Sequence, residues 1–354
     1  MLEQSRPQQP GKTRPLRRVL IGVAALGLVF CLAGALAWHF AAQAATGALD
    51  AMIAQEAAHG RIWTCPDRRI GGFPLSIEVA CQSPSYAGLL SGAPASVRAK
   101  ALRASVAFLH PHEVTAEIEA PFTLRSEDGR TEITAAWTSL RIVATGVPAE
   151  VSEISFRGEG LSAQGHDPAL GSVAFEAARL DGVIGNSASG TPQAVDFRFA
   201  AQQVVNPLIA SALGSSQGVD IRARGTLTQA SFDPTRLPAE NLENWRVRGG
   251  RIDFGDAGFV QDKTQLSARG TLMLDAAHCL QGRLDTEAQG LEPILRRYGI
   301  NPSLAAAGNL LSSFLGGAAP APSAPSALRL PLRFDSGSVI IGPIRTGLRV
   351  PPLY

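Results

Sequence analysis

The strongest constraint on this chain is an uncharged apolar run from Val19 to Phe40 that directly follows a basic segment. At about 1.5 Å of rise per residue, a helix of about twenty residues spans the roughly 30 Å hydrocarbon core of a bilayer. The cations nearest to the run are Lys12, Arg14, Arg17 and Arg18. Basic residues favour the cytoplasmic side of a membrane helix, so we expect the N-terminus to stay in the cytoplasm and the rest to be exported.

This run has three interpretations. A cleaved signal peptide has an apolar core of only about 7–15 residues, and the run is longer, although residues 42–44 fit a cleavage site. Lipidation at Cys31 requires small residues before it, where the chain has Val29 and Phe30. Trp38 lies where an interfacial aromatic belt is expected. The pattern favours an uncleaved anchor over a cleaved signal, and disfavours a lipoprotein.

The charge balance excludes one class of partner. The whole chain has a net charge of +2, but residues 1–18 alone carry +4, so the exported part carries −2. Charges of both signs are scattered along that part without a basic stripe, which excludes nucleic acid. We expect the basic tail, residues 1–18, to contact anionic lipid headgroups at the cytoplasmic face.

Cys65 and Cys81 form a candidate disulfide. Export places both in an oxidising compartment, and a bridge would close a loop of about seventeen residues, worth about 3 kcal/mol in the entropic model. A metal or redox pair is the alternative, but the sixteen-residue spacing without a neighbouring His fits neither well. Cys31 is a small apolar residue of the membrane run, and Cys279 has no predicted role beyond a buried thiol.

Beyond the membrane run, residues 19–40, the sequence predicts a mainly β fold with a few short helices. Residues 41–60 are rich in Ala and lack Pro, which favours a helical stalk. Later segments alternate apolar and polar residues, as in Leu75–Val79, which is typical of half-buried strands. Further strands are expected at 97–108, 113–124, 132–143, 151–156, 173–180, 195–199, 219–227, 264–274, 328–334 and 338–341, and helices at 204–213, 291–298 and 304–314.

These elements predict an elongated or curved antiparallel sheet. The expected divisions after the stalk are a β-rich exported domain at 61–315, an Ala/Pro/Ser linker at 316–327, and a C-terminal hairpin with an apolar tail at 328–354. Residues 223–227 recur as residues 268–272, forty-five positions later. A repeat of this size indicates stacked hairpin units in one sheet. The alternative is that five residues coincide by chance in a chain rich in Gly and Ala.

The segment Arg69–Cys81, following a membrane helix, resembles the bacterial family known as domain of unknown function 2125. The C-terminal segments 330–337, 341–344 and 351–354 resemble the end of the same family. This resemblance covers most of the exported chain. It implies an anchored periplasmic protein and supplies no activity, cofactor or catalytic residue.

A second resemblance, of lower specificity, concerns residues 245–289. The order of the segments 249–254, 266–272 and 280–285 is similar to repeat units of AsmA-like envelope proteins. That resemblance implies a long curved sheet behind one N-terminal helix and a part in lipid traffic toward the outer membrane. Turn glycines and alternating apolar residues dominate these segments, and generic antiparallel sheet has the same composition.

The sequence contains no pattern that favours catalysis. His110, His112 and Glu113 offer two imidazoles and a carboxylate to a divalent metal, but they lie between two predicted strands, where a polar turn is expected. His166 and Asp167 could form a hydrolase dyad only with a nucleophile. The one Gly-x-Ser-x-Gly match, residues 214–218, follows the expected helix at 204–213 and precedes a strand, so it is better interpreted as a linker than as the strand-to-helix elbow of a hydrolase. We therefore expect no enzymatic activity, no metal and no cofactor.

The candidate lipid contacts lie just after the predicted stalk: Arg68, Arg69, Phe73, Leu75 and Ile77. The two arginines, next to two glycines, could meet lipid phosphate, with a solvated turn as the alternative. We expect a single-pass protein of the bacterial inner membrane whose periplasmic domain binds or guides lipid, such as a phospholipid or another acyl ligand, or another hydrophobic envelope component. The alternative is a scaffold that closes its sheet face with its own helices and recruits an envelope protein partner.

Overall fold

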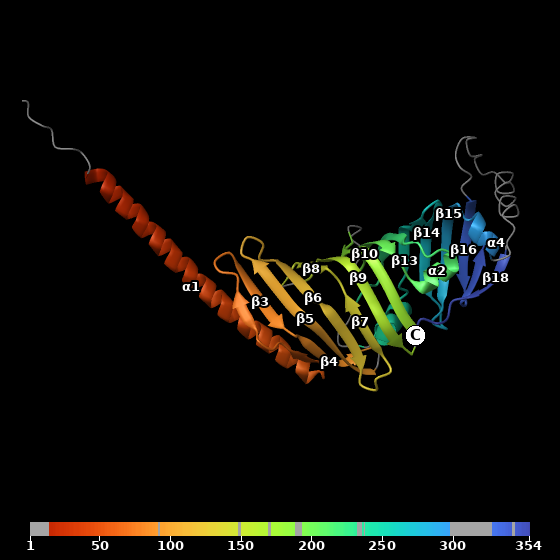
Figure 1. Cartoon of the computed structure of the whole chain (residues 1–354), viewed down its shortest axis with the longest axis horizontal. Helices are drawn as coiled ribbons and strands as arrows, with labels where there is room; N and C mark the ends of the chain where they lie inside the picture. The colour runs from red at the N-terminus through yellow and green to blue at the C-terminus, as the bar shows by residue number, and fades with distance from the viewer. Residues whose placement is uncertain are drawn as a thin grey trace, which may run out of the picture.

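The first element of the structure is one uninterrupted helix, α1 (Arg14–Ala58). It joins the predicted membrane segment and stalk, and in the described chain it is the helix long and apolar enough to cross a membrane. Figure 1 shows α1 leading away from one end of the molecule, with its C-terminal part beside β3. The computed structural model describes residues 14–90, 93–147, 150–168, 171–187, 193–231, 236, 238–297, 328–341 and 344–354.

The part of the sheet next to α1 combines long strands with short ones that lie end to end. β5 pairs with β4 along its first half and with β3 along its second half. β6 pairs in the same manner with β7 and β8, so the strand expected at 132–143 is two strands. The bounds are β1 (Ile62–Thr64), β2 (Arg69–Gly71), β3 (Ser76–Gln82), β4 (Ser85–Leu90), β5 (Ala93–Ala107), β6 (Glu113–Ser126), β7 (Glu132–Ala136) and β8 (Ser139–Thr145).

From β9 onward each strand pairs antiparallel with the next one in the chain. β16 pairs with β15, so the C-terminal strands extend the same sheet. Figure 1 shows a long curved sheet leading from α1 to β18, which confirms the predicted fold class. The bounds are β9 (Glu153–Asp167), β10 (Gly171–Asn186), β11 (Val195–Val204), β12 (Val219–Leu227), β13 (Ile252–Gln261), β14 (Thr264–Leu274), β15 (Leu280–Gln289), β16 (Leu328–Asp335), β17 (Ser338–Ile341) and β18 (Ile344–Arg349).

Three short helices accompany the described strands: α2 (Pro207–Leu213), α3 (Pro238–Val247) and α4 (Glu292–Arg297). The Asn206 side chain caps α2 at its start, and Gly214 ends it in the left-handed conformation. α2 and α4 fall within predicted segments, whereas α3 was not predicted, because its sequence is polar and lacks a clear apolar stripe. The helix expected at 304–314 and the linker at 316–327 lie outside the described residues.

Full burial of large side chains is rare in this sheet. Among the described residues, Val204 and Val219 are the largest side chains that are fully buried. Val204 belongs to a small cluster with Ala177 and Ala201, against which Ile209 of α2 packs. Most other apolar side chains on the strands are half-buried. The described strands therefore form a single layer, in which contacts run between neighbouring strands, and not one half of a sandwich.

The repeated segment lies on β12 and β14, the two neighbours of β13. Gly225 and Gly270 both pair with Phe254, from opposite sides. A Cβ on Gly225 would overlap the backbone oxygen of Asp253 and press against the ring of Phe197. The rings of Phe197 and Phe254 meet edge to face with centroids 5.9 Å apart. Each copy of the repeat thus supplies a glycine where a backbone oxygen of the neighbouring strand lies close to it, and at Gly225 an aromatic ring lies close as well.

Replacing Gly225 with Ala should lower the free energy of unfolding by about 1–3 kcal/mol, the usual cost of overpacking. The added methyl group meets a backbone oxygen of β13 that cannot withdraw without loss of strand pairing. Urea unfolding of the purified full-length chain in detergent measures the change. Gly255→Ala is the matched control, because its nearest neighbouring atom would lie 3.9 Å from the new methyl group. Equal destabilisation by both substitutions would contradict this account.

Candidate functional site

The register of the sheet sorts its alternating residues onto two faces. Residues directly opposite each other on neighbouring strands share a face, and the next residue along each strand lies on the other face. One such set of paired positions crosses the sheet from β3 to β17 without a polar side chain. This apolar row consists of Ile77, Val106, Val114, Ala144, Ile154, Ile184, Phe197, Gly225, Phe254, Gly270, Leu284, Leu332 and Ile341.

The apolar row is long and only partly shielded. At roughly 4.8 Å between neighbouring strands, it extends on the order of 55 Å along the sheet. Ile154 remains 42% exposed and Ile184 remains 47% exposed, while the larger side chains further along are half-buried. Among the described helices, α2 packs on this face, at the ends of β10 to β12. The middle of the row is therefore an apolar surface without a described second layer.

A neighbouring set on the same face has the same character. It begins at Val79 and, up to Thr286, contains apolar residues alone: Val79, Ala104, Ala116, Ile142, Phe156, Gly182, Phe199, Ala223, Ala257 and Ala268. A Cβ on Gly182 would overlap the ring of Phe156. The apolar face is thus at least two residues wide, with aromatic rings lying over glycines.

The opposite face is charged. Arg141 binds Glu117 at 2.6 Å, and Arg157 binds Asp181 at 2.7 Å, along one line of paired positions. The hydrogen bond from Arg179 lowers the pKa of Asp181 below its usual range, against the effect of partial burial. Glu117, Arg141, Arg157 and Asp181 line part of a hollow of about 850 Å³. The charges are paired and face water, so this side of the sheet is the hydrophilic one.

The first position of the apolar row lies next to α1. The indole N–H of Trp38 donates a hydrogen bond to the backbone oxygen of Ser76, at 2.9 Å. The Trp38 ring also meets the ring of Phe73 edge to face, with centroids 5.7 Å apart. Ser76 begins β3 and directly precedes Ile77. These contacts fix the beginning of the row beside the end of the predicted membrane segment.

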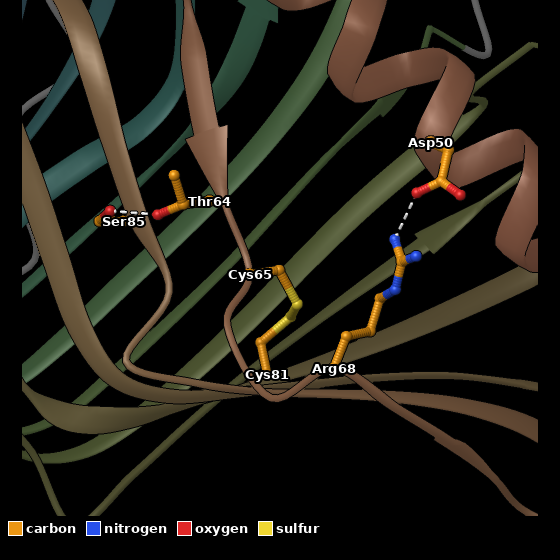
Figure 2. The surroundings of a disulfide bond; sticks show 6 residues. All are labelled: Asp50, Thr64, Cys65, Arg68, Cys81 and Ser85. Carbon is orange, nitrogen blue, oxygen red and sulfur yellow. Dashed lines mark hydrogen bonds and ion pairs between the residues drawn. A yellow bond between two sulfur atoms is a disulfide. The ribbon is translucent and has the colours of Figure 1, made fainter.

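Covalent and ionic contacts reinforce this junction. Cys65 and Cys81 are joined by a disulfide, which ties the segment after β1 to the end of β3. Figure 2 shows this disulfide beside the ion pair between Arg68 and Asp50 of α1, which measures 2.7 Å. Arg61 pairs with Glu56 of α1, and this hydrogen bond lowers the pKa of Glu56. The end of α1 is thus attached to the sheet at several points.

The five candidate lipid contacts occupy different surroundings. Arg68 is directed to Asp50 and holds α1, while Arg69 lies on β2 with an exposed side chain. Phe73 is 56% exposed and its ring meets the Trp38 ring, while Leu75 is 69% exposed in the same segment before β3. Ile77 is half-buried and begins the apolar row. Lipid contact at these residues stays a prediction, but the structure groups Phe73, Leu75 and Ile77 at one end of the apolar face.

The sequence did not indicate the residues that continue this face. Ile184, Phe197, Phe254 and Leu284 are separated by up to 100 positions, and each looks like an ordinary strand residue. The only sequence signal at these positions is the alternation of apolar and polar residues along each strand. The pairing register, which sequence alone does not give, places them in one row.

The histidines considered for a metal lie in turns or at strand ends. His110 and His112 belong to the turn between β5 and β6, and the His112 ring lies 3.4 Å from the backbone oxygen of Val147. Asp167, at the end of β9, accepts a hydrogen bond from Thr131. Within the described ranges, no group of three His, Cys, Asp or Glu residues could hold a metal ion.

Comparison with known families agrees with the family resemblance of the segment Arg69–Cys81 and of the C-terminal segments. The family described as "Uncharacterized protein conserved in bacteria (DUF2125)" matches residues 38–348. The chain belongs to this family. The match begins at Trp38 and includes the junction and nearly the whole sheet. No curated protein matches the chain, and the similarity to AsmA-like proteins stays a prediction.

The last residues of the chain, Leu353 and Tyr354, are fixed by contacts with α3 and with His278. The Tyr354 hydroxyl donates to Glu243 at 2.7 Å, and its ring stacks on His278 with centroids 4.2 Å apart. The Leu353 N–H donates to the His278 backbone oxygen. The Arg246 guanidinium and, to a smaller degree, Tyr354 lower the pKa of Glu243 to about 2. The apolar tail predicted from the sequence is therefore fixed to the helix that was not predicted.

Loss of the disulfide should weaken the junction. Changing Cys65 and Cys81 to Ser together should lower the free energy of unfolding by about 3 kcal/mol, because the bridge closes a loop with a sequence separation of 16. Denaturant unfolding with and without reductant measures this. Reductant should destabilise the natural chain and leave the double variant unchanged. A natural chain whose midpoint does not respond to reductant would rule out this contribution.

Acid should release the C-terminal tail. The pKa of Glu243 is lower in the folded protein, about 2 against an ordinary 4.5, so its contribution is complete above pH 4.5. It is lost as the pH falls from about 4.5 to about 2. Hydrogen exchange of the C-terminal peptide, corrected for intrinsic rates, should show loss of protection of Leu353 in that window. Glu243→Gln should flatten this pH dependence, and an unchanged profile in that variant would contradict the assignment.

Proposed function

We propose that this protein is a single-pass inner-membrane protein whose periplasmic domain binds or guides lipid, or another hydrophobic envelope component, without catalysis. The observation that carries the proposal is the apolar row, which runs from Ile77 beside α1 to Ile341. A sheet with one apolar face gains free energy by covering that face. Each methylene that an acyl chain buries is worth about 0.8 kcal/mol, so ten would contribute about 8 kcal/mol.

The uniform chemistry of the apolar face suits movement of a ligand along it better than tight binding of a ligand at one position. Successive positions of the row have the same apolar chemistry over a length on the order of 55 Å. Glycines such as Gly182 and Gly225 let the rings of Phe156 and Phe197 lie close to the strands. A ligand that advances by one strand therefore exchanges one set of apolar contacts for a similar set. Small differences in free energy between neighbouring positions favour guidance along the face.

Two observations support the topology. The basic residues before the apolar run favour a cytoplasmic N-terminus. The Cys65–Cys81 disulfide fits an oxidising compartment such as the periplasm. Both are consistent with a helix long and apolar enough for a single-pass anchor.

Photo-crosslinking tests the proposal directly. Benzoylphenylalanine at Ile184, on the apolar face, should form phospholipid adducts when membranes holding the full-length chain are irradiated. The same group at Val183, the adjacent residue on the charged face, is the matched control. We expect at least a fivefold excess of lipid adduct at position 184, measured by mass spectrometry of the purified protein.

The adducts also separate this proposal from the scaffold alternative. An apolar face closed by protein would give crosslinks at position 184 to this chain or to a partner protein, without lipid. That result would contradict lipid handling. Equal lipid adducts at positions 183 and 184 would show general exposure to the bilayer and would also contradict a lipid path on one face.

A further inference from the structure

A second group of exposed apolar residues lies at the end of the sheet nearest to the predicted membrane surface. Phe73 and Leu75 in the segment before β3 are 56% and 69% exposed. Phe108 and Leu109 in the turn between β5 and β6 are 43% and 82% exposed. We call these four residues the apolar tip. Large apolar side chains on a turn are costly in water, so a group of them marks a contact surface.

The position of the apolar tip along α1 identifies what it contacts. Trp38 is two residues before the end of the apolar run at Phe40, or about 3 Å along the helix axis. The ring of Phe73 lies 5.7 Å from the ring of Trp38. With the run in a bilayer, Trp38 lies at the interface between hydrocarbon and headgroups, where aromatic residues are enriched. Phe73 then lies at the same depth.

Backbone contacts hold the remaining tip residues at this level. The Phe108 N–H donates to the backbone oxygen of Leu75 at 3.0 Å, and Ser76 accepts from the Trp38 indole. Gly146 N–H donates to the backbone oxygen of His112, which ties the next turn to the same group. The turn between β5 and β6 and the turn after β8 are therefore fixed relative to α1, so the position of α1 in a bilayer also sets theirs.

We propose that the apolar tip inserts into the interfacial layer of the bilayer that α1 crosses. This gives the domain a second membrane contact. Ile77, the first position of the apolar row, is two residues from Leu75. The apolar face of the sheet therefore begins at the depth of the apolar tip. The tip therefore sets the entrance of the row at the membrane surface, where lipid can pass from the bilayer onto the sheet. This inference rests on the membrane anchor of the proposed function.

Spin labels on the full-length chain test the insertion. The chain with Cys279→Ser is reconstituted in phosphatidylcholine and phosphatidylglycerol vesicles, with Cys31 replaced by Ser when another position is labelled. A nitroxide at Leu109→Cys should collide with dissolved oxygen more often than with a water-soluble nickel chelate, by at least threefold. Leu75→Cys serves as a second tip position if the first variant does not reconstitute.

Leu89 provides the matched control. This leucine is 56% exposed, in the range of the tip residues, and pairs with Pro94 at the opposite end of β5. That end lies roughly 40 Å from Ala107, because each strand residue advances about 3.3 Å. A nitroxide at Leu89→Cys should favour the nickel chelate. The natural Cys31, within the apolar run, reports on the anchor itself.

The three positions separate the two proposals. An oxygen-rich signal at Cys31 with a water-like signal at position 109 would overturn the insertion of the tip and leave the anchor intact. A water-like signal at Cys31 would overturn the anchor, and the insertion with it. Low access to both reagents at position 109 would indicate coverage by protein, which also contradicts insertion.

Discussion

The antiparallel pairing register is the interaction on which the rest of the structure depends. Each strand alternates apolar and polar residues, and this alternation creates two faces only when neighbouring strands are in matching register. A shift of one residue at any strand would place its apolar residues among the charges of the other face. The row from Ile77 to Ile341 persists through every strand pairing that it crosses. Because no described second layer covers its middle, this register leaves an apolar surface there, and the small buried cluster around Val204 forms only where α2 packs on the sheet.

The charged face and the glycines follow from the same register. Ion pairs such as Arg141 with Glu117 connect neighbouring strands and keep one face in water. Exposed pairs of this kind add little stability, typically about 0–1 kcal/mol each. Their main effect is to make the two faces chemically opposite. On the apolar side, Gly225 and Gly270 flank Phe254, so that the rings pack beside strands that carry no side chain at those positions.

The junction fixes the sheet relative to α1, the helix that is long and apolar enough to cross a membrane. Trp38 contacts the start of β3, the disulfide joins the segment after β1 to β3, and Arg68 pairs with Asp50. Residues on α1, on the segment between β1 and β2, and on β3 are thus combined at one end of the sheet. The apolar row begins at this point. The proposals for lipid guidance and for insertion of the apolar tip both depend on that coincidence.

The sequence by itself determined the local features. The apolar run ending at Phe40 and the alternation of the later segments predicted one long helix and a mainly β domain. The recurrence of residues 223–227 at 268–272 indicated repeated units of one sheet, and these two segments lie on β12 and β14. It did not indicate α3, whose residues have no apolar stripe, or the division of residues 132–143 into two strands. The tertiary structure alone decided which apolar residues form a row, and that the row begins beside Trp38. The physical reason is that alternation is a property of one strand, whereas register is a property of two strands that lie far apart in the chain.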